Sequence, residues 1–210
     1  TSNIVGKFDL TIGEGSNLIS LPLIPASTDI NAVIGNQLKS GTVLTADKIS
    51  YTYYDSNSAT YVTKQAFLNN SGLWQSSDLT SIEPDRGYSV TRQAGAGATF
   101  VTVVGSLFLS NTRNINLTQG SNMIGTVYPV SVPLNNANLA VVLTPGTVLN
   151  ADKVNYYDNQ SQSMQSAYLG SDGLFHSANL TTLEPGKGYY VNNQVLVNTP
   201  NPDVWSYTKP

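Results

Sequence analysis

The chain contains a single histidine, and imidazole is the side chain most often used as a general base near neutral pH. His176 closely follows Ser171 and Asp172, and these are the three residue types of a hydrolytic triad. The members of a triad, however, normally come from separated segments of a chain. We therefore interpret His176 as a surface residue just past a hairpin and not as a catalytic base.

Carboxylates are the second group that could perform chemistry. Glu83 and Glu184 occupy matching positions in two similar segments, whereas a glycosidase needs two acids about 5–10 Å apart across one cleft. Both lie in a Glu-Pro-x-Lys/Arg-Gly-Tyr motif, in which proline fixes φ and glycine permits positive φ, so we interpret each as a turn. We interpret Asp47-Lys48 and Asp152-Lys153 as local ion pairs at strand entrances. The chain is thus not expected to be an enzyme.

Metal and cofactor sites have little support in the sequence. The turns at 55–58 and 158–161 supply oxygen atoms but have neither the spacing nor the pivot glycine of a calcium loop. The chain has no cysteine and no phosphate-binding loop. We expect no metal and no cofactor.

Aromatic residues offer a different chemistry, the stacking of sugar rings. The chain has 12 tyrosines and 2 tryptophans. Tyr54 and Tyr157 fall on the polar face of their expected strands, so they are the candidate glycan contacts. A carbohydrate-binding or adhesive surface module is the alternative that these residues leave open.

Charge is scarce: charged residues make up 11% of the chain, against about 25% in typical soluble domains, and the net charge is −3. Such a surface favours neither nucleic acid nor an anionic membrane as a partner. The sequence has no apolar run of transmembrane length, so membrane insertion is not expected. Four Asn-x-Ser/Thr sequons and a first residue other than Met suit an exported product, and we expect an extracellular or cell-surface location. The candidate glycosylation sites are Asn69, Asn116, Asn159 and Asn179.

The sequence repeats itself, and this duplication defines the organisation that we expect. Residues 15–19 return as 120–124, residues 41–49 as 146–154, and residues 83–88 as 184–189. We expect features kept in both copies to be required by the fold. The predicted divisions are repeat 1 at 1–93, a Gly/Ala linker at 94–98, repeat 2 at 99–198, and an apolar C-terminal tail at 199–210 without a counterpart in repeat 1.

Alternating apolar residues predict that each repeat is mainly strand. Residues 48–53, for example, place Ile49, Tyr51 and Tyr53 on one face. Each repeat has one short helical pattern, at 28–38 after the potential cap Asp29 and at 135–143. We therefore predict a mainly β chain of two tandem homologous β-sandwich or barrel-like domains, each with one short helix.

Two motifs resemble a β-rich module of bacterial and archaeal secreted and surface proteins. One is the opening at Gly15 to Pro22, and the other is the close at Leu183 to Val191. Both repeats also carry the Ala-Asp-Lys-Ile/Val strand between them, although the second repeat departs from the opening at 125–128. The resemblance implies an accessory or scaffold module at a cell surface, and it brings no catalytic residue with it.

We expect a non-catalytic extracellular structural protein that assembles with copies of itself, head-to-tail, into a filament or surface array. The first strand looks truncated, which would leave an open sheet edge, and the apolar tail would supply a strand to a neighbour. The candidate subunit contacts are Ile4, Val5, Val195, Leu196, Val197, Val204, Trp205 and Tyr207.

Overall fold

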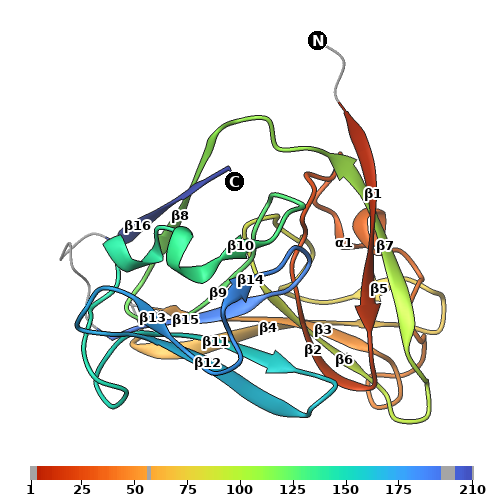
Figure 1. Cartoon of the computed structure of the whole chain (residues 1–210). Coiled ribbons are helices and arrows are strands. Elements are labelled where there is room, and N and C mark those ends of the chain that lie inside the picture. The colour runs from red at the N-terminus through yellow and green to blue at the C-terminus, as the bar shows by residue number, and fades with distance from the viewer. Residues whose placement is uncertain (1–3, 56–57, 195–201, 210) are drawn as a thin grey trace.

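The structure is a computed structural model that describes residues 4–55, 58–194 and 202–209. It is mainly β and consists of two similar halves, as the duplication predicts (Figure 1). Each half contains a five-stranded and a two-stranded antiparallel sheet. The predicted fold class is therefore confirmed.

The first half is built from the strands that precede Leu107. Its five-stranded sheet has the order β2 (Gly15–Ile19), β6 (Tyr88–Arg92), β3 (Lys48–Asp55), β4 (Thr60–Leu68), β5 (Trp74–Gln75). Its two-stranded sheet pairs β1 (Val5–Ile12) with β7 (Thr99–Ser106).

The second half repeats this arrangement. Its five-stranded sheet has the order β13 (Phe175–His176), β12 (Ser163–Leu169), β11 (Lys153–Asp158), β15 (Tyr189–Asn193), β9 (Gly120–Ile124). Its two-stranded sheet pairs β8 (Thr112–Leu117) with β16 (Asp203–Thr208), and a further short pair joins β10 (Val132–Pro133) to β14 (Thr182–Leu183).

The strand pairing differs from the boundary that we expected at residue 99. β7 does not open the second half; it pairs with β1 along the whole strand, from Val5 opposite Ser106 to Ile12 opposite Thr99. Residues 94–98 accordingly connect β6 to β7 within the first half. β1 is also a full strand and not a truncated one. Local motifs mark where a repeat begins but carry no information on which distant strand completes it.

The C-terminal tail is the equivalent of β7. Val101 lies opposite Leu10 in the first half, and Trp205 lies opposite the matching residue Ile115 in the second. The tail therefore has a counterpart in the first repeat, contrary to the sequence prediction. Its apolar character follows from its place, because alternate residues of β16 are buried.

The helices are short, as expected, but the two halves differ. In the first half, α1 (Ile30–Val33) begins at Asp29, whose carboxylate accepts hydrogen bonds from two backbone N–H groups of the first turn. In the second half, the predicted helix consists of two 3₁₀ turns, η1 (Leu134–Asn136) and η2 (Leu139–Val141). Pro133 at the first N-cap supplies no capping side chain. No helix of the described residues is long and apolar enough to cross a membrane.

Each half has its own hydrophobic core, and β16 supplies the largest side chain of the second. Trp205 is completely buried, and its indole N–H donates a 2.6 Å hydrogen bond to the Ala137 carbonyl. Its ring lies 5.1 Å from the ring of Tyr207, which contacts Tyr128 at 5.0 Å. The tail is thus part of the second core.

Trp205→Ala should lower the free energy of unfolding by about 3–5 kcal/mol, because the change leaves a large cavity and an unpaired carbonyl. Urea denaturation followed by tyrosine fluorescence measures the loss. Val204→Ala is the matched control, since Val204 is the neighbouring residue and points outward with 43% of its surface exposed. Equal losses for the two variants would contradict the placement of β16.

Candidate functional site: two equivalent clefts between the repeats

The single histidine lies on the surface at β13. Its Nε2 is 3.0 Å from an oxygen of Asp172, and its ring stacks on Tyr168 with the ring centroids 5.4 Å apart. The hydrogen bond from His176 lowers the pKa of Asp172. Both side chains of the pair are largely exposed, so the arrangement is a hydrogen-bonded surface pair next to a hairpin.

Both Glu-Pro-x-Lys/Arg-Gly-Tyr motifs fold into loops that their own tyrosine closes. The Tyr88 hydroxyl accepts a 2.7 Å hydrogen bond from the Glu83 backbone N–H, and Tyr189 does the same for Glu184. Burial raises the pKa of Tyr88 to about 12. The motif thus holds a compact turn before β6 and β15, and we call residues 83–88 and 184–189 the clasp loops.

The second clasp loop reaches across to β2 of the first repeat. The Ser20 N–H donates a 2.9 Å hydrogen bond to the Gly186 carbonyl, and the Gly188 N–H donates a 3.1 Å bond to the Leu18 carbonyl. Ile19 and Lys187 form an antiparallel bridge between these two bonds. The loop therefore extends the edge of the first repeat's sheet.

The first clasp loop returns the same contact to β9 of the second repeat. The Gly125 N–H donates a 3.0 Å hydrogen bond to the Asp85 carbonyl, and the Gly87 N–H donates a 3.2 Å bond to the Met123 carbonyl. These atoms are the sequence equivalents of the previous set. The two repeats are therefore related by an approximate two-fold axis, and each clasp loop forms the same backbone hydrogen bonds to the other repeat.

Glycine is required where the two clasp loops meet. A Cβ on Gly87 would stand 2.7 Å from the Ile124 carbonyl oxygen and 3.3 Å from the Gly188 Cα. A Cβ on Gly188 would stand 2.6 Å from the Ile19 carbonyl oxygen. The reason for these glycines is close approach of two backbones, whereas the positive φ that we expected in this motif occurs at Gly186.

Two equivalent clefts flank this contact. The first has a volume of about 440 Å³ and lies between residues 8–19 of the first repeat and residues 156, 158–160 and 185–187 of the second. The second has a volume of about 310 Å³ and lies between residues 114–124 of the second repeat and residues 51–54 and 85–86 of the first. These clefts are the concave surfaces that the duplication creates.

The clefts differ in their chemistry at matching positions. In the first, the side chains of Phe8 and Leu10 pack against Gly186. Beside the second, Arg113 replaces the phenylalanine and forms three hydrogen bonds to Asp85, which replaces the glycine. The Arg113 Nε lies 2.8 Å from an Asp85 oxygen. An apolar contact in one cleft thus corresponds to an ion pair in the other.

The candidate glycan contacts are both half-buried. Tyr54 packs edge-on against Tyr61 with the centroids 5.4 Å apart, and the Tyr61 hydroxyl accepts a 3.0 Å hydrogen bond from the Ser121 N–H across the repeat interface. Tyr54 also lines the second cleft. The Tyr157 hydroxyl donates a 3.0 Å hydrogen bond to Gln162.

The four sequons occupy different environments. The Asn159 amide donates to the carbonyls of Glu14 at 2.6 Å and Ser16 at 2.9 Å, so both of its N–H groups serve the repeat interface. Asn69 is half-buried and caps the turn that follows it. Asn116 and Asn179 are exposed.

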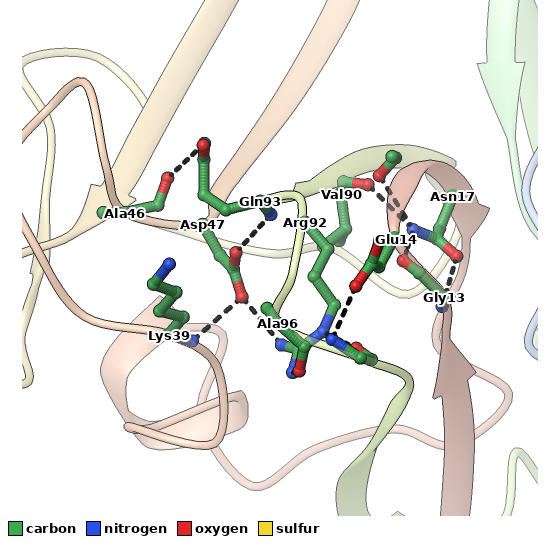
Figure 2. A network of polar contacts seen from close by, with 12 residues as sticks. Gly13, Glu14, Asn17, Lys39, Ala46, Asp47, Val90, Arg92, Gln93 and Ala96 are labelled. Atoms are coloured by element: carbon green, nitrogen blue, oxygen red, sulfur yellow. Dashed lines mark hydrogen bonds and ion pairs between the residues drawn. The ribbon is translucent and has the colours of Figure 1, made fainter.

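A buried carboxylate organises the end of β6 (Figure 2). Asp47 is completely buried and accepts hydrogen bonds from Arg92 at 2.8 Å and from the backbone N–H groups of Lys39 at 2.9 Å and Gln93 at 2.8 Å. Its ionic partner is therefore Arg92 and not the adjacent Lys48.

The second repeat holds the equivalent Asp152 without an arginine. Asp152 is also completely buried and accepts from the backbone N–H groups of Thr144 at 2.7 Å and Gln194 at 2.8 Å. Asn193 stands at the position of Arg92 and donates to Asp203 at 3.0 Å. The buried Asp152 carboxylate is therefore stabilised by backbone N–H groups and not by the expected local ion pair with Lys153.

The candidate subunit contacts divide into three groups. Ile4, Val5 and Val204 are exposed, whereas Trp205 and Tyr207 are buried in the second core. The candidates Val195, Leu196 and Val197 lie outside the described residues.

No group of three or more His, Cys, Asp or Glu side chains is placed to hold a metal within the part of the chain that the structure describes. No family model, curated protein or solved structure matches the chain. The function must therefore be argued from the two repeats themselves.

Gly87→Ala should destabilise the protein by roughly 1–3 kcal/mol, because the new methyl group pushes the first clasp loop away from the Ile124 carbonyl of β9. Urea denaturation gives this difference. Gly6→Ala is the control, since a Cβ there makes only ordinary contact, 3.6 Å from Leu23. If Gly87→Ala proved as mild as the control, the repeats would not be held together by the clasp loops.

Proposed function

We propose that the chain is a non-catalytic extracellular structural protein that self-assembles head-to-tail into a filament or surface array. The observation that carries the proposal is β16, the last strand of the second repeat, which buries Trp205 and Tyr207 in a core built by the rest of that repeat. Exchange of an identical element between copies reproduces every contact of the single chain, so it is a low-cost route to association.

The geometry of such an exchange favours an open polymer. Each copy carries one β16 to donate and one β8 to receive a neighbour's strand. An exchange of this kind that does not close on itself continues from copy to copy, as heterologous contacts do. The two clasp loops hold the repeats of one copy together, so each copy would join the polymer as a single rigid unit.

The polar chemistry of the chain supports a structural role. The recurring acids serve turns and buried networks, in which Glu184 pairs with Lys187 at 2.8 Å and Asp47 pairs with Arg92. Low charge also weakens the repulsion between closely stacked copies. The exposed sequons at Asn116 and Asn179 favour the extracellular assignment.

A cysteine pair tests strand exchange directly. Asn114 and Ser206 lie opposite each other on β8 and β16, and their side chains are 2.9 Å apart. If assembled Asn114→Cys/Ser206→Cys protein is oxidised, exchange should yield a ladder of covalent oligomers on a non-reducing denaturing gel. Asp9→Cys/Thr102→Cys is the matched control, because this equivalent pair joins β1 to β7, which is anchored at both ends; it should give monomers.

Only monomeric bands from assembled double-cysteine protein would overturn the exchange of β16. A native chain that stays monomeric at all concentrations, in sedimentation velocity and in electron micrographs, would overturn self-assembly as a whole. The two results are distinguishable because the first requires polymers to be present.

A carbohydrate-binding or adhesive module is the second candidate, and the second cleft is the observation that favours it. Tyr51 and Tyr53 stack there with their ring centroids 5.6 Å apart, and the amide group of the exposed Asn116 shares the lining. Aromatic rings beside amide groups match the apolar faces and hydroxyl groups of a sugar.

Glycan-array binding by the native chain should be lost in Tyr54→Ala, whose side chain lines the second cleft. The equivalent change Tyr157→Ala should leave it unchanged, because Tyr157 is not among the residues that line the first cleft. An absence of glycan binding, or equal loss in both variants, counts against the second cleft as a sugar site.

A further inference from the structure

Each repeat exposes aliphatic side chains at the same positions. Leu44 is 80% exposed, and its equivalent Leu149 is 88% exposed. Large exposed apolar groups that recur in this way mark contact surfaces more often than scattered ones do. The three equivalent pairs are Val43 and Val148, Leu44 and Leu149, Leu73 and Leu174.

The fold does not require these side chains. In the first repeat, the turn is closed by a 3.0 Å hydrogen bond from the Thr42 N–H to the Thr45 hydroxyl and by the buried Ala46. In the second, Asn150 replaces the threonine as the acceptor, at 2.7 Å from the Thr147 nitrogen. The residues between these anchors point outward, so their conservation between the repeats needs another reason.

The exposed residues of each repeat come from two adjoining turns. Gly41 bridges to Asn69, whose N–H donates a 2.9 Å hydrogen bond to the Leu73 carbonyl. In the second repeat, Gly146 bridges to Gly170, which donates a 2.8 Å bond to Leu174. We call the turns 41–46 and 69–73 the first end, and the turns 146–151 and 170–174 the second end.

The two ends lie on opposite sides of the molecule. The first end adjoins β5 and the second adjoins β13, the strands at the right and left of the view in Figure 1. Each strand is the outer edge of its own sheet, whereas the clasp loops lie between the sheets. A copy with two exposed apolar ends that face away from each other can bind a neighbour at each end. Such contacts continue from copy to copy and form an open polymer.

The charges of the two ends are complementary. Lys39 is exposed beside the first end, and it forms no ion pair among the described residues. The matching position in the second repeat is Thr144, which has no charge. Asp172 is exposed on the second end, where it accepts a hydrogen bond from His176 and carries a negative charge at neutral pH, and its equivalent is the uncharged Ser71. Opposite charges therefore favour contact between unlike ends.

We propose that the first end of one copy binds the second end of the next copy, as a contact separate from the exchange of β16. The proposal rests on the proposed self-assembly and names a surface for it. The aliphatic side chains pack across the contact, and Lys39 faces Asp172 of the neighbour. The partner is a second copy of this chain, because the duplication gives each copy both halves of the contact.

The experiment uses full-length Asn114→Cys/Ser206→Cys protein oxidised as a monomer, which locks β16 to its own β8 and blocks exchange. In sedimentation velocity, the locked chain should still form concentration-dependent oligomers. Adding Val43→Thr/Leu44→Ser should leave monomers, and so should adding Val148→Thr/Leu149→Ser. An equimolar mixture of these two variants should form dimers and nothing larger, because one intact contact remains.

Val104→Thr/Leu109→Ser in the locked chain is the matched control, because both residues are exposed and belong to neither end; it should associate like the locked parent. Lys39→Glu should weaken association at least severalfold, as should Asp172→Asn, which keeps an oxygen for the Leu174 N–H. A monomeric locked chain would overturn this contact while leaving the exchange of β16 intact. Dimers formed by either end variant alone would show that like ends bind, which would equally overturn it.

Discussion

The structure depends on the hydrogen bonds that each clasp loop donates and accepts across the interface between the repeats. Four backbone bonds form two symmetric bridges, and Gly87 and Gly188 lie next to each other between them. Backbone atoms meet there without side chains between them, so the contact has one geometry and tolerates little variation. Both clefts and the opposed ends follow from this single junction, since it fixes how one sheet lies relative to the other.

Because the chain contains two copies of one fold, comparing matching positions shows which residues the fold keeps and which it allows to vary. The glycines of the junction and the tyrosines that close each loop are unchanged in both copies. Around them, the contact between Phe8 and Gly186 at one position corresponds to the ion pair between Arg113 and Asp85 at the matching one. Both positions changed together, which is what packing at a shared interface demands. The backbone contact between the clasp loops is therefore the same in both copies, whereas the residues around the two clefts differ.

Local sequence signals predicted the class of the fold and its strands well, because alternation and capping act over a few residues. Asp29 as a helix cap is one example. The partners of β7 and β16 were not predictable, since antiparallel pairing between distant strands leaves no local mark. The same holds for Asp47, where the neighbour Lys48 suggested itself but the distant Arg92 supplies the charge. At the candidate site, the sequence identified the clasp motif as a turn but gave no sign that it joins the repeats.

A residue that recurs in both copies can be kept either for packing within each repeat or for contact with another molecule. The burial of its side chain distinguishes these two causes. Ala46 and Ala151 are completely buried, so their recurrence reflects packing within each repeat. Leu44 and Leu149 recur two residues earlier in the same turns, yet nearly all of each side chain is exposed. Solvation favours a polar residue at such a position, and neither copy has acquired one although the adjacent Thr45 and Asn150 have diverged. The stability of the single chain therefore does not explain the two exposed leucines. Association through both ends of every copy would explain them, because it would bury the leucine of each repeat in a contact.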